Sequence, residues 1–201
     1  MSPTAGKRPA KRSDARERLL ATASGLFYAE GISKVGVDRI VSASNVTLAT
    51  FYRHFPGKQD LVVAYLDQAH AFEAQRMAEL AERTQGRDLV RAIGEEVVGM
   101  ISRPNFRGCA FINAGAEFED PEHPVRRVVA EHRQWYLERL RRAFADAGHP
   151  RPTNPARHFM MMRDGTVTAG YLDSPTAVRR AFTRGVEGLL RSIDTATDDD
   201  G

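Results

Sequence analysis

Cysteine and long apolar runs are both scarce in this chain of 201 residues. Cys109 is the only cysteine, so an intramolecular disulfide is excluded, and a lone thiol is typical of a reducing compartment. No apolar run approaches the roughly 18 residues that a membrane-spanning helix needs. The basic and polar residues 1–13 do not resemble a secretory signal. We therefore expect a cytoplasmic protein with no membrane partner.

The sequence motifs of common enzymes are missing as well. There is no Gly-x-Ser-x-Gly turn, no phosphate-binding glycine loop and no histidine pair at metal-ligand spacing. An enzyme would have to use Cys109 or a serine as its nucleophile, with a histidine as the base. The histidines for that role are His54, His70, His123, His132, His149 and His158. We expect no catalytic residues, no cofactor and no metal site.

The formal net charge of +3 conceals an uneven distribution. Residues 1–60 contain ten Lys and Arg against five Asp and Glu, whereas the rest of the chain contains 19 against 21. A basic first part joined to a nearly neutral second part favours a polyanion partner, most simply nucleic acid.

Apolar residues recur at three- and four-residue spacing through most of the chain, and no alternation of period two is sustained. The pattern predicts an all-α fold with an N-terminal three-helix unit and a larger helical body. The expected segments are a flexible basic arm over residues 1–12, a helix-turn-helix domain over 13–60, a helical body over 61–194, and a disordered acidic tail over 195–201. A long fourth helix, starting near Leu61, would connect the two domains.

Residues 36–61 contain two short helical patterns around a turn at Asn45. Thr47 is suited to cap the second short helix, and free amides at a helix start can bind a phosphate. Phe51 and Phe55 are predicted to face inward. The outward positions are Leu48, Thr50, Tyr52, Arg53 and His54, whose side chains can contact base edges and phosphates. The less specific interpretation is an amphipathic unit that is only core plus surface.

The same segment resembles the DNA-binding domain of the tetracycline-repressor (TetR) family. The matching residues are Val37, Asp38, Ile40, Val46, Thr47, Thr50, Phe51, Tyr52, His54, Phe55, Lys58 and Leu61. The resemblance covers about the first third of the chain. It implies DNA contacts by Thr47, Thr50, Tyr52, His54 and Lys58. Gly36 and Gly57 depart from the family pattern, because glycine cannot cap a helix with a side chain, and Asn45 replaces a turn glycine.

Residues 107–144 resemble the ligand-binding domain of one subgroup of that family. The resemblance implies a homodimer in which helices of two subunits form a four-helix bundle. We predict that the apolar stripes of residues 135–144 and 182–193 form that bundle. The alternative, that both stripes belong to the core of one chain, would leave the protein monomeric, which fits poorly with two-fold operators.

Several residues of this second part are candidates for a ligand pocket. Cys109, Asn113 and Glu117 follow at four-residue steps and share one helix face. They can line a pocket, with Glu117 suited to a cationic or hydrogen-bonding ligand, or form a structural network. Cys109 can be a sensor thiol or a small buried residue. Further pocket candidates, each of which can also be core, are His132, Trp135, Tyr136, Met160, Met161, Met162, Asp164 and Tyr171.

These patterns predict a sequence-specific transcriptional regulator that binds double-stranded operator DNA as a homodimer. Within the resemblance, repression and release by a small-molecule effector are the expected mode of action. The alternative is a nucleoid-associated protein that binds DNA without sequence preference, or an interaction module that uses the basic first part as a charge patch.

Overall fold

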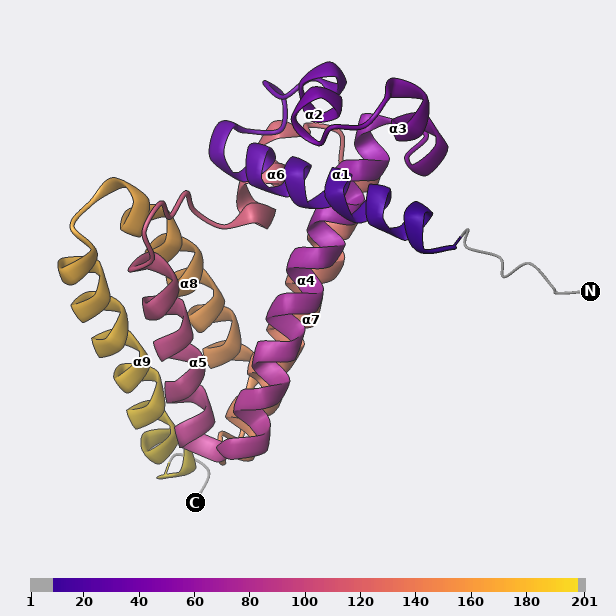
Figure 1. Cartoon of the computed structure of the whole chain (residues 1–201). Helices are drawn as coiled ribbons and strands as arrows, with labels where there is room; N and C mark the ends of the chain where they lie inside the picture. The colour runs from indigo at the N-terminus through magenta and orange to yellow at the C-terminus, as the bar shows by residue number, and fades with distance from the viewer. Residues whose placement is uncertain (1–8, 199–201) are drawn as a thin grey trace, which may run out of the picture. The chain divides into compact units, whose positions relative to one another are not determined.

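The computed structural model describes residues 9–198, which form helices and contain no strand (Figure 1). The helices are α1 (Pro9–Glu30), α2 (Val37–Ala43), α3 (Leu48–His54), α4 (Lys58–Arg83), α5 (Gly86–Ile101), α6 (Ala110–Glu117), α7 (Pro124–Asp146), α8 (Thr153–Leu172) and α9 (Pro175–Asp198). The predicted all-α fold is therefore confirmed. The two short helices of the helix-turn-helix pattern lie where the sequence predicted them.

The chain divides into two compact units. The first contains residues up to Gln68 together with Ala114–Val128, and the second contains Ala69–Asn113 together with the chain from Val129 onward. Helices α4, α6 and α7 each contribute residues to both units. This division differs from the expected segments 13–60 and 61–194, because a part distant in sequence joins the first unit.

In the first unit, α1 packs on α2 and α3 (Figure 1). The core is made by side chains that are almost completely buried, including Leu19, Phe27, Ile40, Phe51 and Leu61. Helices as short as α2 and α3 are unstable alone, so this shared core is what holds them.

Two left-handed residues shape the turns of the first unit. Gly31, with φ of 91°, ends α1, and Asn45, with φ of 53°, makes the turn between α2 and α3. The turn at Asn45 agrees with the sequence prediction, and glycine and asparagine both tolerate this backbone region. Gly36 precedes α2 without a side-chain cap, as glycine requires.

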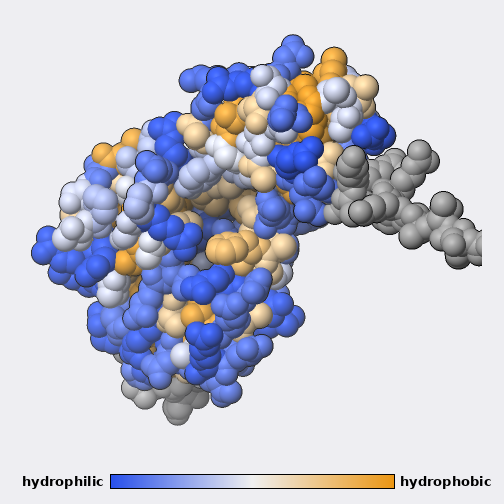
Figure 2. Space-filling view, viewed as in Figure 1, coloured by the Kyte–Doolittle hydropathy of each residue, from blue (hydrophilic) through white to orange (hydrophobic). Residues whose placement is uncertain are grey.

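In the second unit, α5, α8 and α9 pack side by side (Figure 1). Phe159 of α8 and Phe182 of α9 meet edge to face with ring centroids 5.5 Å apart. Gly170 permits the close approach of α8 to α5, because a Cβ there would lie 2.8 Å from Ile101. The face of this unit shown in Figure 2 is mostly hydrophilic over α5 and α9.

The structure corrects two expectations. Helix α1 begins at Pro9, so residues 9–12 are helical and not part of an arm; proline is favoured at a first helical position. Helix α9 continues to Asp198, so the tail prediction is wrong for residues 195–198. The remaining predicted arm and tail residues, 1–8 and 199–201, lie outside the described part of the chain.

The burial of α7 and α9 bears on the predicted subunit interface. Tyr136, Leu140 and Phe144 in α7 are buried within a single chain. The same holds for Phe182 and Leu190 in α9. Because these side chains are packed in the core of their own chain, the two stripes are intrachain core, and the choice of helices that join two subunits stays a prediction.

Candidate nucleic-acid interface and ligand cavity

The start of α3 is held by a side-chain cap. Thr47 has extended backbone geometry, and its Oγ1 accepts a hydrogen bond of 3.1 Å from the backbone N–H of Thr50. The two threonine hydroxyls also lie 2.9 Å apart. The predicted capping role of Thr47 is confirmed. The cap satisfies one of the amides at the helix start and leaves others for an anionic ligand.

Helix α3 has one buried and one exposed face. Phe51 and Phe55 are buried, whereas Leu48 and Tyr52 remain 44% and 54% exposed. The ring of Tyr52 meets that of Phe51 edge to face, with centroids 5.2 Å apart, which restricts the tyrosine. Figure 2 shows apolar surface over α2 and α3 among hydrophilic residues. An exposed leucine and tyrosine on one short helix form a face that can contact thymine methyl groups and phosphates.

The remaining predicted DNA-contacting residues border this face. Thr50, His54 and Lys58 are each half-buried, so they are less accessible than Leu48 and Tyr52. Burial lowers the pKa of Lys58, and the nearby Glu117 carboxylate opposes that shift.

Glu117 connects the end of α6 with the turn after α1. Its two carboxylate oxygens accept hydrogen bonds from the backbone N–H groups of Ile32, at 2.9 Å, and Ser33, at 2.6 Å. Burial alone would raise the pKa of Glu117, but these hydrogen bonds outweigh it and the pKa is lowered. The carboxylate is therefore occupied by the backbone of the first unit, which supports its structural interpretation over ligand binding.

The second unit contains a cavity of about 160 Å³ between α4, α5, α7 and α8. Its apolar lining residues are Ala69, Phe72, Met77, Leu80, Ile93, Val97 and Met100. Its polar lining residues are Glu73, Arg76, Glu96, Arg103, Tyr136 and Arg163. A mostly apolar cavity with a few converging polar groups is typical of small-molecule sites. Tyr136 is the predicted pocket residue that lines it.

Arg163 is the most deeply buried charged group in the described chain, with 2% of its surface exposed. Its Nη1 lies 3.3 Å from Asp164 and its Nη2 lies 3.7 Å from Glu73. The guanidinium also lies 4.5 Å from the centroid of the Tyr136 ring, a cation–π contact. Neither the sequence pattern nor the family resemblance singled out Arg163 or Glu73. The available signal was a charged residue four positions after Phe159 on the buried face of α8.

His132 belongs to a cluster of aromatic side chains. Its ring stacks on Phe111 of α6 with centroids 3.5 Å apart, and its Nδ1 lies 3.0 Å from Nδ1 of His70. Burial, reinforced by the positive charge of Arg163, lowers the pKa of His132 to about 3. His132 is neutral at physiological pH and packs as core rather than as a cavity wall.

Trp135, Met160, Met162 and Tyr171 also lie outside the cavity lining, as do four further predicted pocket residues. Cys109 is buried, and its Sγ is 3.8 Å from Nη2 of Arg163. Asn113 donates a hydrogen bond to the carbonyl oxygen of Arg107. Asp164 pairs with Arg133 at 2.7 Å.

Met161 is the fourth of these residues. Its side chain is 73% exposed, and Met161 is not among the residues that line the cavity. The prediction that Met161 contacts a ligand therefore gains no support from this cavity.

Within residues 9–198, no cluster of histidine, cysteine and carboxylate side chains is arranged to hold a metal ion. No helix in the described part of the chain combines the length and apolar character that spanning a bilayer requires.

Comparison with known families matches both parts of the chain. The model of bacterial regulatory proteins of the tetR family matches residues 19–65, and the model of the tetracyclin repressor-like C-terminal domain matches residues 86–184. Among solved structures, a TetR-family transcriptional regulator from Streptomyces coelicolor is 47% identical with a TM-score of 0.87. That similarity covers 90% of this chain and 96% of the other.

A second relative is the HTH-type transcriptional repressor NemR of Escherichia coli strain K12. It is 28% identical over 119 residues, which are 58% of this chain and 60% of NemR, so the similarity spans less than two thirds of that protein. The crystal structure of E. coli NemR in its reduced form is 21% identical over its matched length, with a TM-score of 0.70, and shows likeness of fold.

Proposed function

The chain belongs to the TetR family of bacterial transcriptional regulators. We propose that it is a homodimeric repressor that a small-molecule effector releases from its operator. The observation that carries the proposal is the exposed face of α3, with its capped start at Thr47 and its projecting Leu48 and Tyr52.

In this proposal α3 is the recognition helix and enters the major groove. Leu48 and Tyr52 approach the bases, while Thr47, Thr50, His54 and Lys58 contact phosphates or bases at the border of the face. Two copies of α3 in a symmetric dimer reach successive major grooves about one helical turn apart, which requires a palindromic operator.

The dimer uses a face that the single chain leaves uncovered. Met161 and Leu172, both on α8, are 73% and 70% exposed. Between them lies the exposed Gly165, which allows another helix to approach closely. Exposed large apolar side chains eleven residues apart lie on one side of a helix. Their burial against a second copy removes them from water, which favours dimerisation.

The effector acts through α6 in this mechanism. Phe111 near the start of α6 stacks on His132, and Glu117 at its end binds the backbone of Ile32 and Ser33. A molecule in the cavity binds best to one arrangement of Arg163 and its neighbours. That preference shifts the position of α6, and with it the turn before α2 to which Glu117 is bonded. Because the effector binds one conformation better, it shifts the population away from the DNA-binding form.

The test is a fluorescence anisotropy titration of the whole protein against DNA from directly upstream of its own and neighbouring genes. Physiological salt and excess competitor DNA are needed, because nonspecific affinity depends strongly on salt. We expect saturable binding to one palindromic fragment at least about a thousandfold tighter than to scrambled DNA. Equal, salt-sensitive affinity for both would contradict the proposal and support a nucleoid-associated protein.

Tyr52→Ala separates the recognition face from the fold. We expect it to weaken operator binding by about 1–3 kcal/mol, with an unchanged elution volume in size-exclusion chromatography. Tyr28→Phe in α1 is the matched control and should bind the operator like the unaltered protein. Unchanged affinity of Tyr52→Ala would rule out α3 as the recognition helix.

A further inference from the structure

The cavity of the second unit holds a cation whose hydrogen-bonding capacity is incompletely used. Arg163 has 2% of its surface exposed, and its Nε has no hydrogen-bond partner among the described residues. A guanidinium has five N–H donors and cannot lose its charge inside a protein. A buried donor without an acceptor is unfavourable, so Arg163 can still take an acceptor oxygen.

The carboxylates near Arg163 do not supply that acceptor. Glu73 is 3.7 Å from Nη2 of Arg163 and 3.5 Å from Nε2 of His132, both beyond good hydrogen-bond length. Asp164 is 3.3 Å from Nη1, but its other oxygen is held at 2.7 Å by Arg133. Neither carboxylate makes the short, paired contact that arginine forms with a well-placed anion.

The charge of the cavity lining also favours an anionic ligand over a cationic one. Three arginines and two glutamates line it, and Arg76 of α4 is already paired with Glu96 of α5. A cationic ligand would meet the charge of Arg163 in a mostly apolar space, which disfavours it.

The remaining walls set the size of the ligand. Phe72, Ile93 and Val97 are apolar, and the cavity volume is about 160 Å³. Cavities of roughly 150 Å³ accept a molecule as large as benzene.

From this geometry we propose that the effector is a small, largely apolar organic carboxylate, whose carboxylate binds Arg163 and whose body packs against Phe72, Ile93 and Val97. This assignment rests on the effector role proposed above. The ligand carboxylate satisfies the donor of Arg163 that Glu73 leaves unused, and Glu73 is the competing anion.

Three probes of one shape and different charge test the class in the full-length protein: benzoate, benzyl alcohol and benzylamine. By calorimetric titration we expect benzoate to bind about tenfold or more tightly than benzyl alcohol, as a charge-assisted hydrogen bond does, and benzylamine to bind weakest. Benzoate binding no more tightly than benzyl alcohol would overturn the proposal.

Two variants test the roles of Arg163 and Glu73 in this interaction. Arg163→Met should weaken benzoate binding about tenfold and change benzyl alcohol binding little. Glu73→Gln removes the competing anion and should tighten benzoate binding several-fold, at about unchanged affinity for benzyl alcohol. If circular dichroism shows that Arg163→Met does not fold, the Glu73→Gln variant and the three probes test whether a carboxylate binds Arg163. Equal benzoate affinity in Glu73→Gln and the unaltered protein would contradict the role of Arg163.

Operator titrations in parallel separate this proposal from the function itself. Tight, specific DNA binding without benzoate binding would reject the ligand class and leave the repressor function in place. Benzoate binding through Arg163 without specific DNA binding would reject the repressor function and leave the ligand class in place.

Discussion

Glu117 accepts a 2.9 Å hydrogen bond from the backbone N–H of Ile32, although 85 residues separate the two. The second oxygen of the same carboxylate accepts from the backbone N–H of Ser33. One side chain from α6 thereby fixes the turn that follows α1 and precedes the helix-turn-helix. The charged carboxylate accepts hydrogen bonds from two backbone N–H groups that are otherwise unpaired. Hydrogen bonds to a charged acceptor are stronger than those between neutral groups.

Glu117→Gln tests the energetic importance of this contact. Replacing one oxygen with an amide nitrogen places a donor against a backbone donor, so we expect the free energy of unfolding to fall by about 1–3 kcal/mol. Urea denaturation followed by circular dichroism measures the change. Glu119→Gln, an exposed neighbour, is the control and should stay within about 0.5 kcal/mol of the unaltered protein. Equal effects of both substitutions would show that the contact contributes nothing.

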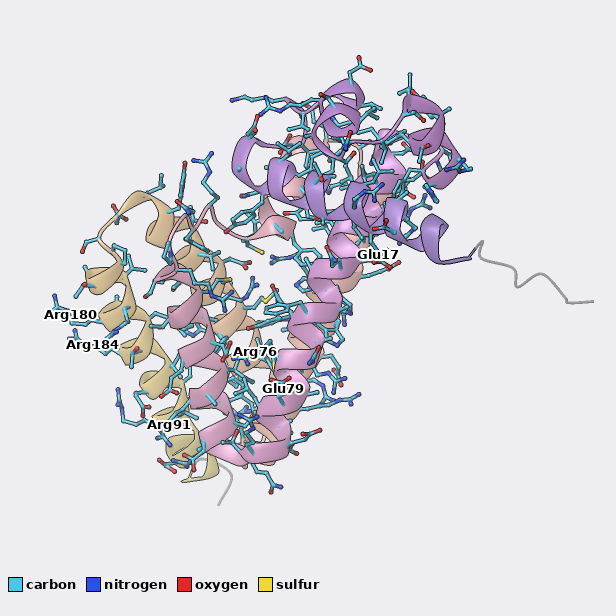
Figure 3. All side chains as sticks on the ribbon, in the orientation of Figure 1. Glu17, Arg76, Glu79, Arg91, Arg180 and Arg184 are labelled. Carbon is cyan, nitrogen blue, oxygen red and sulfur yellow. The ribbon has the colours of Figure 1, made fainter. Side chains whose placement is uncertain are left out.

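Lys58→Met tests a phosphate contact at the border of the α3 face. The loss of one lysine–phosphate contact should weaken binding about equally for all operator sequences and reduce the salt slope of the affinity by about one. Anisotropy titrations at several salt concentrations give that slope. Arg180→Met is the matched control, because Arg180 points away from α9 into solvent in the second unit (Figure 3). A slope that Lys58→Met leaves intact would remove Lys58 from the interface.

Met161→Glu tests the proposed dimer face. Two glutamates buried at a symmetric interface carry like charges away from water, so we expect dissociation into monomers and loss of operator binding. Sedimentation velocity reports the mass. Glu82→Lys reverses a charge at an exposed position of α4 and should leave the dimer intact. A dimer that persists in Met161→Glu would show that another face joins the subunits.

His132 makes the stability of the protein depend on pH. Its pKa is about 3 in the folded chain against 6.5 for an unperturbed histidine. Below pH 6.5 the unfolded chain takes up a proton that the folded chain does not. The free energy of unfolding therefore falls from about pH 6.5 toward pH 3, by at most about 1.4 kcal/mol per pH unit for this one group.

His132→Leu isolates this contribution, since leucine cannot titrate. Denaturation at pH 7, 6 and 5 should show the stability of the variant rising relative to the unaltered protein as the pH falls. A difference that stays constant over this range would mean that His132 is protonated as easily in the folded chain as in the unfolded one.

Much of the fold could be predicted because its signals are local. The turn at Asn45, the cap at Thr47 and the stop at Gly31 each depend on the backbone preferences of one or two residues. The inward positions of Phe51 and Phe55 follow from helical period alone. The candidate recognition face could be located for the same reason, together with the family resemblance of its residues.

The ligand cavity could not be predicted in the same way. Tyr136 was among the expected residues, but Arg163 and Glu73 come from two helices that are about 90 positions apart in the sequence. A helical period shows which face of each helix is buried, and not which faces meet. Met161 and Arg163 are only two positions apart, yet one is 73% exposed and the other 2%.

By itself, the sequence determined the helices, their turns and the residues presented by α3, because these depend on neighbours within a few positions. Only the tertiary structure decided that the stripes of α7 and α9 are core, that Glu117 binds the backbone of the first unit, and that Arg163 faces a cavity. Those outcomes depend on packing between segments distant in the chain, where burial and hydrogen-bond satisfaction select one arrangement among many that share the same local pattern.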